Sequence, residues 1–133
     1  MTDTFQGSCL CGAVEYQLSK SPKALSHCHC SQCRKSHGAA FASYGSVLRC
    51  DLQLIRGGDN IKSYKSSESV LRQFCCHCGS SLFWSRNQDD YSDWISIALG
   101  TLDSTFTSDN QKHIEVASKA SWYHIQGHWP QFQ

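Results

Sequence analysis

Eight of the nine cysteines in this chain fall into three tight groups, and this grouping limits the possible folds more than any other feature. An odd number of cysteines cannot pair completely in disulfides, and the first residues, 1–4, lack the basic start and apolar run of a secretory signal. A chain of 133 residues buries roughly two-thirds of its unfolded surface, so it needs no crosslinks to form a core. We therefore expect a reduced, cytoplasmic protein whose thiols bind metal.

Charge and hydropathy exclude two classes of partner. The chain has 12 Lys and Arg against 11 Asp and Glu, which gives no basic surface for nucleic acid. No apolar run approaches the roughly 18 to 20 residues of a membrane span. Because no internal repeat or linker interrupts the sequence, residues 1–133 are expected to form a single domain. Oligomeric state leaves no signal in the sequence.

Alternating polar and apolar residues predict a mainly β fold built from hairpins. The expected strands are residues 14–18, a hairpin of 52–55 with 61–64 around the turn 57–60, a second hairpin of 70–74 with 81–85, and a central strand 94–99 that ends at Gly100. Short helices are expected at residues 31–37 and 118–123. The hairpin turns carry the cysteines, so metal ligands and strand ends should coincide.

The first and third cysteine groups can form one closed metal site. Cys75-x-x-Cys78 followed by Gly79 is typical of a zinc knuckle, since Gly79 can adopt the positive φ that such a turn requires. Cys9 and Cys11 would lie about 6.7 Å apart on a flat strand and need a bend to share a metal. Taken alone, that pair is better explained as two small half-buried side chains. Together the two pairs supply the four thiolates of a structural zinc site.

The middle group, Cys28-x-Cys30-x-x-Cys33, supplies three ligands. Three protein ligands and one exchangeable position are typical of catalytic zinc. The alternative is a closed structural site completed by one further side chain, with these candidates: His27, His29, His37 and Cys50. We favour the open site because His29, between two ligands, should project to the opposite side. Cys50 and Cys76 belong to neither ligand set, and Cys76 should point away from the metal of its neighbour Cys75.

Arg34 and Lys35 directly follow Cys33. Two cations beside thiolates can lower thiol pKa values or bind a substrate carboxylate, although a solvated basic pair on a helix is the commoner situation. The four Trp and six Phe are expected mainly in the core, although Phe41 and Trp84 lie close in sequence to the cysteine groups and could line a pocket. His113, His124 and His128 lack ligand spacing, so structural or surface roles are expected for them.

These motifs resemble the glutathione-dependent formaldehyde-activating enzyme family, which includes centromere protein V-like domains. The resemblance extends over about residues 5–132. It rests on Gly7-x-Cys9-x-Cys11-Gly12-x-Val14-x-Tyr16, Cys28-His29-Cys30-x-x-Cys33-Arg34-Lys35-x-x-Gly38, Phe74-Cys75-x-x-Cys78-Gly79, Gly100-Thr101-Leu102-Asp103, His113-Ile114, Lys119 and Trp122. It implies a β-tent-like fold of hairpins and small sheets held together by zinc, with short helical turns.

The resemblance also implies ligand sets and an activity. Cys9, Cys11, Cys75 and Cys78 match the ligands of the family's structural zinc, and Cys28, Cys30 and Cys33 match those of its catalytic zinc. The implied reaction is that of a carbon–sulfur lyase on a thiol–aldehyde adduct such as S-hydroxymethylglutathione, with glutathione as co-substrate and Arg34 or Lys35 holding its carboxylate. The alternative is a non-catalytic zinc-containing module that binds or carries a thiol or aldehyde.

Overall fold

The computed structural model describes residues 4–133, and the fold is mainly β, as the sequence predicts. The strands are β1 (Phe5–Ser8), β2 (Glu15–Leu18), β3 (Leu25–Cys28), β4 (Ala42–Leu48), β5 (Leu52–Arg56), β6 (Ile61–Lys65), β7 (Val70–Cys75), β8 (Ser81–Arg86), β9 (Trp94–Ala98) and β10 (Gln111–Ile114). One α-helix, α1 (Ser31–His37), and five 3-10 turns, η1 (Arg49–Asp51), η2 (Gly58–Asn60), η3 (Asp89–Tyr91), η4 (Leu99–Thr101) and η5 (Val116–Ser118), complete the described elements.

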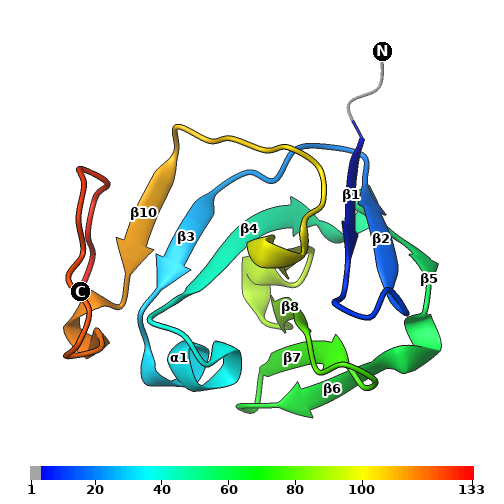
Figure 1. The fold of residues 1–133 in the computed structure, drawn as a ribbon, viewed down its shortest axis with the longest axis horizontal. Coiled ribbons are helices and arrows are strands. Elements are labelled where there is room, and N and C mark those ends of the chain that lie inside the picture. Colours follow the sequence, from blue (N-terminus) through cyan, green and yellow to red (C-terminus); the bar gives the residue numbers. More distant parts are fainter. Residues whose placement is uncertain (1–3) are drawn as a thin grey trace.

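The strands form two sheets of different size (Figure 1). The small sheet has the order β1-β2-β5, and the large sheet has the order β10-β3-β4-β9-β8-β7-β6. Among the described strands, β10 and β3 pair in parallel, whereas all other pairs are antiparallel. The last residues return along β10, where Phe132 N donates to His113 O, so the end of the chain lies beside the large sheet (Figure 1).

The main hydrophobic core lies between the two sheets. Tyr16 and Leu18 point to one side of β2, as the alternation predicts, and both are fully buried, as is Val14 just before the strand. They pack with residues of the large sheet, including Phe83 and Ile97. Since one face of the large sheet is occupied by this core, its other face is available for a site.

Several local predictions are confirmed. β7 and β8 form the expected hairpin, and β9 is the central strand of the large sheet. The helix at residues 31–37 begins at Cys30, whose Sγ accepts from Cys33 N, and ends at Gly38 with a left-handed φ of 60°. Within residues 4–133, no helix is long and apolar enough to span a bilayer.

The predicted hairpin of residues 52–55 with 61–64 is wrong. β5 pairs with β2 in the small sheet, whereas β6 pairs with β7 in the large sheet. The turn between them starts at Gly57, whose φ is 84°, and continues as η2. The glycine-rich turn therefore carries the chain from one sheet to the other instead of folding it back on itself.

The predicted helix at residues 118–123 is also wrong. The chain forms η5 and then continues irregularly to the C-terminus. The Lys119 ammonium donates to the carbonyls of Ala120 and Tyr123. The Lys119 side chain thus satisfies carbonyls that a helix over residues 118–123 would have left without an intrahelical partner.

The connection between the sheets yields a stability prediction. A Cβ at Gly57 would lie 2.0 Å from Ala13 O and would require a positive φ. Gly57→Ala should therefore lower the free energy of unfolding by about 2 to 4 kcal/mol. In the matched control Gly58→Ala the nearest atom is 3.7 Å away, so a change within about 0.5 kcal/mol is expected. Urea unfolding measures both, and equal midpoints for the two variants would contradict the prediction.

Candidate metal centres and the cysteine cavity

Four cysteines from the two sheets meet in one cluster. The Sγ atoms of Cys9, Cys11, Cys75 and Cys78 all lie within 4.8 Å of one another. The separation is 3.7 Å between Cys9 and Cys11 and 3.9 Å between Cys11 and Cys75. Cys9 and Cys11 follow β1 of the small sheet, whereas Cys75 ends β7 and Cys78 lies in the turn between β7 and β8. The cluster therefore joins the two sheets.

Local turns produce this geometry. Gly12 and Gly79 both have φ of 79°, a conformation that glycine adopts without a steric cost. The bend after β1 also directs Val14 N at Cys9 Sγ, at 3.3 Å. Hydrogen bonds from Ser80 are the largest cause lowering the pKa of Cys78, to about 5. Cys76 is exposed and lies outside the cluster, as its sequence position predicts.

The middle group forms a second cluster at the junction of β3 and α1. The Sγ atoms of Cys28, Cys30 and Cys33 all lie within 4.8 Å of one another. Cys28 is the last residue of β3, Cys30 caps α1, and Cys33 lies in its first turn. The strand end and the helix start thus bring three thiols together within six residues of chain.

Both donor sets fit zinc. Thiolate ligands at about 2.3 Å in a tetrahedron have sulfur atoms about 3.8 Å apart, close to the separations of 3.7 and 3.9 Å in the four-cysteine cluster. All nine cysteines are free thiols. The four-cysteine cluster could hold a metal with a complete set of protein ligands, whereas the three-cysteine cluster would leave one position for another ligand.

The proposed fourth ligands of the second cluster are hydrogen-bonded elsewhere. His27 bonds to Ser43 and Gln111, His29 to His113, His37 to Tyr44, and Cys50 lies exposed next to Asp51. Within the described chain, no other His, Cys, Asp or Glu atom joins the three thiols to form a larger cluster. This geometry supports the open site over the closed alternative.

A nearby guanidinium affects the three-cysteine cluster. Arg72 Nη1 and Nη2 lie 3.7 and 3.8 Å from Cys33 Sγ. A hydrogen bond from Cys28 is the largest cause lowering the pKa of Cys33 to about 5, and Arg72 adds to the effect. The pKa of Cys28 is raised by the same contact and by burial. Three thiols this close cannot all ionise without a cation, and Cys33 carries the negative charge most readily.

The three cysteines line a cavity of about 610 Å³ on the face of the large sheet opposite the main core. Strand register builds its wall, because Arg72 pairs with Trp84, and Trp84 pairs with Ser96. Arg86 follows Trp84 by two residues and therefore shares its face. Trp84 lines this cavity, the alternative to a core position, whereas Phe41 packs against His27 and His29. The other cavity-lining residues include Arg86, Tyr91 and Glu115.

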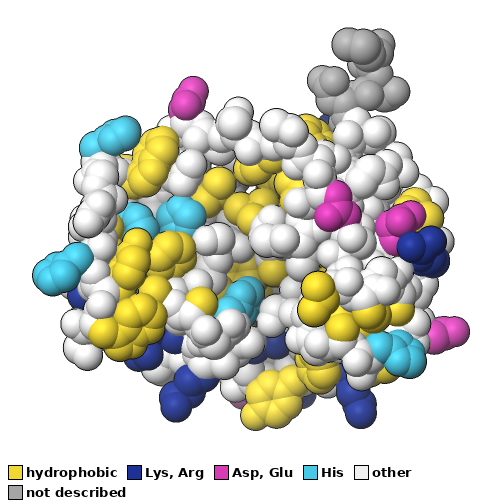
Figure 2. Space-filling view, viewed as in Figure 1, with side chains coloured by type: hydrophobic (Ala, Val, Ile, Leu, Met, Phe, Trp, Pro, Cys, Tyr) yellow, Lys and Arg dark blue, Asp and Glu magenta, His cyan; other side chains and the backbone are white. Residues whose placement is uncertain are grey.

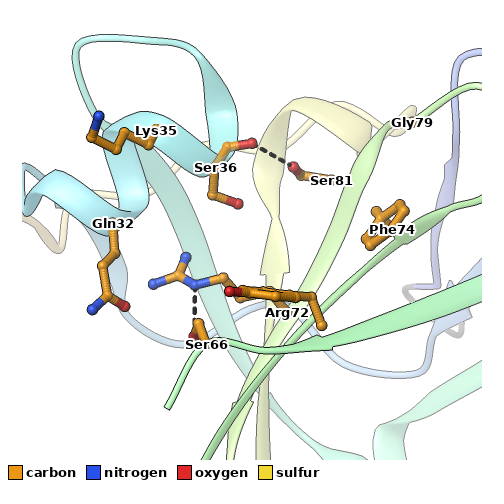
Figure 3. A pocket seen from close by; sticks show the side chains of 9 residues that line it. Gln32, Lys35, Ser36, Ser66, Arg72, Phe74, Gly79 and Ser81 are labelled. Atoms are coloured by element: carbon orange, nitrogen blue, oxygen red, sulfur yellow. Dashed lines mark hydrogen bonds between the residues drawn. The ribbon is translucent and has the colours of Figure 1, made fainter.

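A second cavity of about 540 Å³ lies between α1 and the β6 to β8 region and shares Gln32 and Arg72 with the first. In Figure 3 the Arg72 guanidinium lies between Gln32 and Ser66, and Arg72 Nε donates to Ser66 Oγ at 3.0 Å. Lys35 also lines this cavity. Lys and Arg side chains gather along the lower part of the face drawn in Figure 2, where Figure 1 shows α1 and β6. Arg34 lies on the other side of α1, with Nε 3.4 Å from His29 O.

His29 projects to the side opposite the cysteines on either side of it, as predicted. It is fully buried, and its Nε2 lies 2.8 Å from Nδ1 of the buried His113. Burial is the main cause lowering the pKa of His29 to about 4, and His113 contributes next. The pair holds the cysteine loop against β10, so His113 has the structural role expected for it. His124 and His128 are exposed.

Sequence reasoning missed Arg72, Arg86 and Glu115. None of them belongs to a recognisable motif, and each lies on a strand or turn far from residues 28–33 in the sequence. For Arg72 the sequence carried one signal, its place in the alternating strand 70–74, but alternation does not say which face meets the cysteines.

Two relatives match part of the chain. An uncharacterized lyase of Schizosaccharomyces pombe is 29% identical over 60% of this chain and 56% of its own length. A putative glutathione-dependent formaldehyde-activating enzyme of Podospora anserina is 33% identical over 62% of this chain and 41% of its own length. The chain thus spans about half the length of these curated relatives.

A solved structure and a family model also match this chain. A crystal structure of a Rhodobacter sphaeroides protein aligns with a TM-score of 0.62 and 25% identity, covering 76% of this chain and 90% of that chain. The family model of the glutathione-dependent formaldehyde-activating enzymes matches residues 4–120. The match includes both cysteine clusters and all of the described strands. The chain therefore belongs to the glutathione-dependent formaldehyde-activating enzyme family.

Proposed function

We propose that this chain is a zinc-dependent carbon–sulfur lyase that acts on the adduct of glutathione, or another thiol, with an aldehyde, such as S-hydroxymethylglutathione. The observation that carries the proposal is the group of three thiols in a cavity of about 610 Å³ with no fourth ligand from residues 4–133. Membership of the family supports a thiol and an aldehyde as substrates.

Two zinc ions per chain complete the proposal. Cys9, Cys11, Cys75 and Cys78 would hold a structural ion, and Cys28, Cys30 and Cys33 would hold the catalytic ion. Zinc with an exchangeable position supplies a Lewis acid that lowers the pKa of a substrate thiol, so that thiolate is present at neutral pH.

The protein's own residues position and stabilise the sulfur. In the lyase direction the carbon–sulfur bond breaks with its electron pair left on sulfur, and the hydroxyl proton is released to solvent as the aldehyde carbonyl forms. A sulfur leaving as thiolate needs positive charge nearby. The Arg72 guanidinium, 3.7 Å from Cys33 Sγ, supplies it at the cavity wall. Its hydrogen bond to Ser66 fixes its orientation.

Lys35 and Arg34 are proposed contacts for a glutathione carboxylate. The position of Lys35 beside Arg72 in the adjoining cavity supports its role. Arg34 Nε is directed at His29 O, so its contribution would come from the remaining guanidinium nitrogens.

We further propose that residues 1–133 act as one domain in the cytoplasm, with no nucleic-acid or membrane partner. Nine free thiols support a reducing compartment. With both zinc ions bound by thiolates, a formal charge of +1 would become slightly negative, which disfavours nucleic acid and leaves a small thiol and an aldehyde as partners.

The test is the rate at which S-hydroxymethylglutathione exchanges with free glutathione and formaldehyde. Exchange NMR measures this rate with and without the zinc-loaded protein. We expect clear acceleration over the uncatalysed exchange, because the reaction is otherwise limited by the small thiolate fraction at neutral pH. If the protein binds the thiol without accelerating exchange, the carrier alternative is correct and the lyase assignment is wrong.

A cysteine substitution in one cluster should affect zinc content and folding differently from a substitution in the other. Cys75→Ala should lose one zinc and fail to fold, because Cys75 is fully buried where the two sheets meet. Cys30→Ala should lose one zinc of two and keep the fold, because its cluster lies within a single strand–helix junction. Mass spectrometry measures the zinc content of each variant, and circular dichroism measures its folded structure.

The matched control for this pair is Cys76→Ala, next to Cys75 but outside the cluster. It should keep both ions and the wild-type unfolding midpoint. Equal loss of structure in Cys75→Ala and Cys30→Ala would mean that both sites are structural.

A further inference from the structure

A third cavity, of about 490 Å³, lies beside the cysteine cavity on the face of the large sheet opposite the main core. The two cavities share four lining residues, Trp84, Arg86, Tyr91 and Ser96. The other residues that line the third cavity are Lys23, Ala24, Ser46, Asp90 and Trp94. We call it the indole cavity, after its two tryptophans. Because the two cavities have a wall in common, a ligand can extend from one into the other.

Strand register creates the hollow. Ser46 of β4 lies directly opposite Ser96 of β9, and Ser96 lies opposite Trp84 of β8. Trp94 precedes Ser96 by two residues on β9 and therefore shares its face. Two small side chains thus lie next to two indole rings, which leaves space above the serines and gives that space aromatic walls.

The charged side chains of this cavity lie in solvent or against aromatic rings. Lys23 and Asp90 are both exposed. The Arg86 guanidinium carbon lies 5.7 Å from the ring centroid of Trp84 and 5.5 Å from that of Tyr91, so the two rings hold it by cation–π contact. The inner surface is therefore mainly aromatic, and such a surface suits an apolar or aromatic group.

Trp84 connects the three thiols to the indole cavity. It packs against the buried cluster that contains Cys28, Cys33 and Tyr44, and its ring centroid lies 6.4 Å from that of Tyr44. From standard sheet spacings, the Cα atoms of Trp84 and Trp94 lie about 8 Å apart, one strand across and two residues along. A ligand whose sulfur lies at the thiols can therefore reach the indole cavity with a chain of several carbons, but a single carbon is too short.

We propose that the indole cavity binds the organic group of the aldehyde, so that this chain prefers an apolar or aromatic aldehyde larger than formaldehyde. The inference rests on the proposed function, in which the adduct carbon is bonded to the thiol sulfur, a hydroxyl, a hydrogen and the aldehyde substituent. In formaldehyde that substituent is a second hydrogen, which does not fill the cavity. A substituent of several carbons would bury apolar surface against Trp84 and Trp94 and gain affinity.

The experiment compares two inert analogues of the adduct, S-hexylglutathione and S-methylglutathione, which differ only in the length of the S-alkyl chain. Isothermal titration calorimetry with the zinc-loaded protein measures both affinities for wild type, Trp94→Ala and Ser46→Phe. Both substituted residues line the indole cavity but not the cysteine cavity. Wild type should bind the hexyl compound at least about tenfold more tightly, because burial of two or more methylene groups accounts for that factor.

Both variants should lose most of this preference for the hexyl compound. Trp94→Ala removes an apolar wall, and Ser46→Phe fills the hollow. The affinity of both variants for S-methylglutathione should stay close to that of wild type. The matched control Trp122→Ala replaces an exposed indole outside both cavities and should keep the wild-type preference. Unfolding midpoints in urea show which variants remain folded.

Equal affinity of wild type for the two compounds, no binding of S-hexylglutathione to wild type, or an undiminished hexyl preference in a folded variant would each overturn the inference. These results are independent of turnover. Accelerated exchange of S-hydroxymethylglutathione without a hexyl preference would leave the lyase function standing, with formaldehyde as its aldehyde. A hexyl preference that depends on Trp94, without accelerated exchange of the formaldehyde or hexanal adduct, would leave the binding site standing and remove the lyase.

Discussion

The contact of four thiols between the two sheets is the constraint on which the rest of the fold depends. Cys9 and Cys75 are almost completely buried within the main core, and their cluster joins the bend after β1 to the turn between β7 and β8. Because the small sheet has only three strands, it depends on this junction and on the packing of Tyr16 for its position. The same junction orients β7 and β8, which carry Arg72 and Arg86 into the cavity.

The two faces of the large sheet divide structure from chemistry. One face packs against the small sheet, and the other carries the three-cysteine cluster and its cavity. Alternation along β3 and the following loop explains how one short segment serves both needs. Cys28 and Cys30 contribute to the thiol cluster, whereas His29 between them is buried against His113 of β10. The buried imidazole pair fixes the loop, which leaves the thiols accessible from the cavity.

Sequence reasoning succeeded where the determining contacts are local. The β7–β8 hairpin and helix α1 could be predicted because each is specified within a few residues of its turn or cap. It failed at the turn after β5, since a glycine-rich turn between two apolar runs does not state whether the runs pair with each other. The register shows that they join different sheets. The parallel pairing of β10 with β3 likewise left no local signal.

The sequence by itself determined the two cysteine clusters and the mainly β architecture, because the spacing of thiols within a turn and the alternation along a strand are short-range properties. Tertiary structure alone decided what surrounds the three thiols. Arg72, Arg86 and Glu115 come from β7, β8 and the end of β10, and only strand order and register bring them to one cavity. The charges that would recognise a substrate are therefore set by long-range pairing, which no motif in the chain encodes.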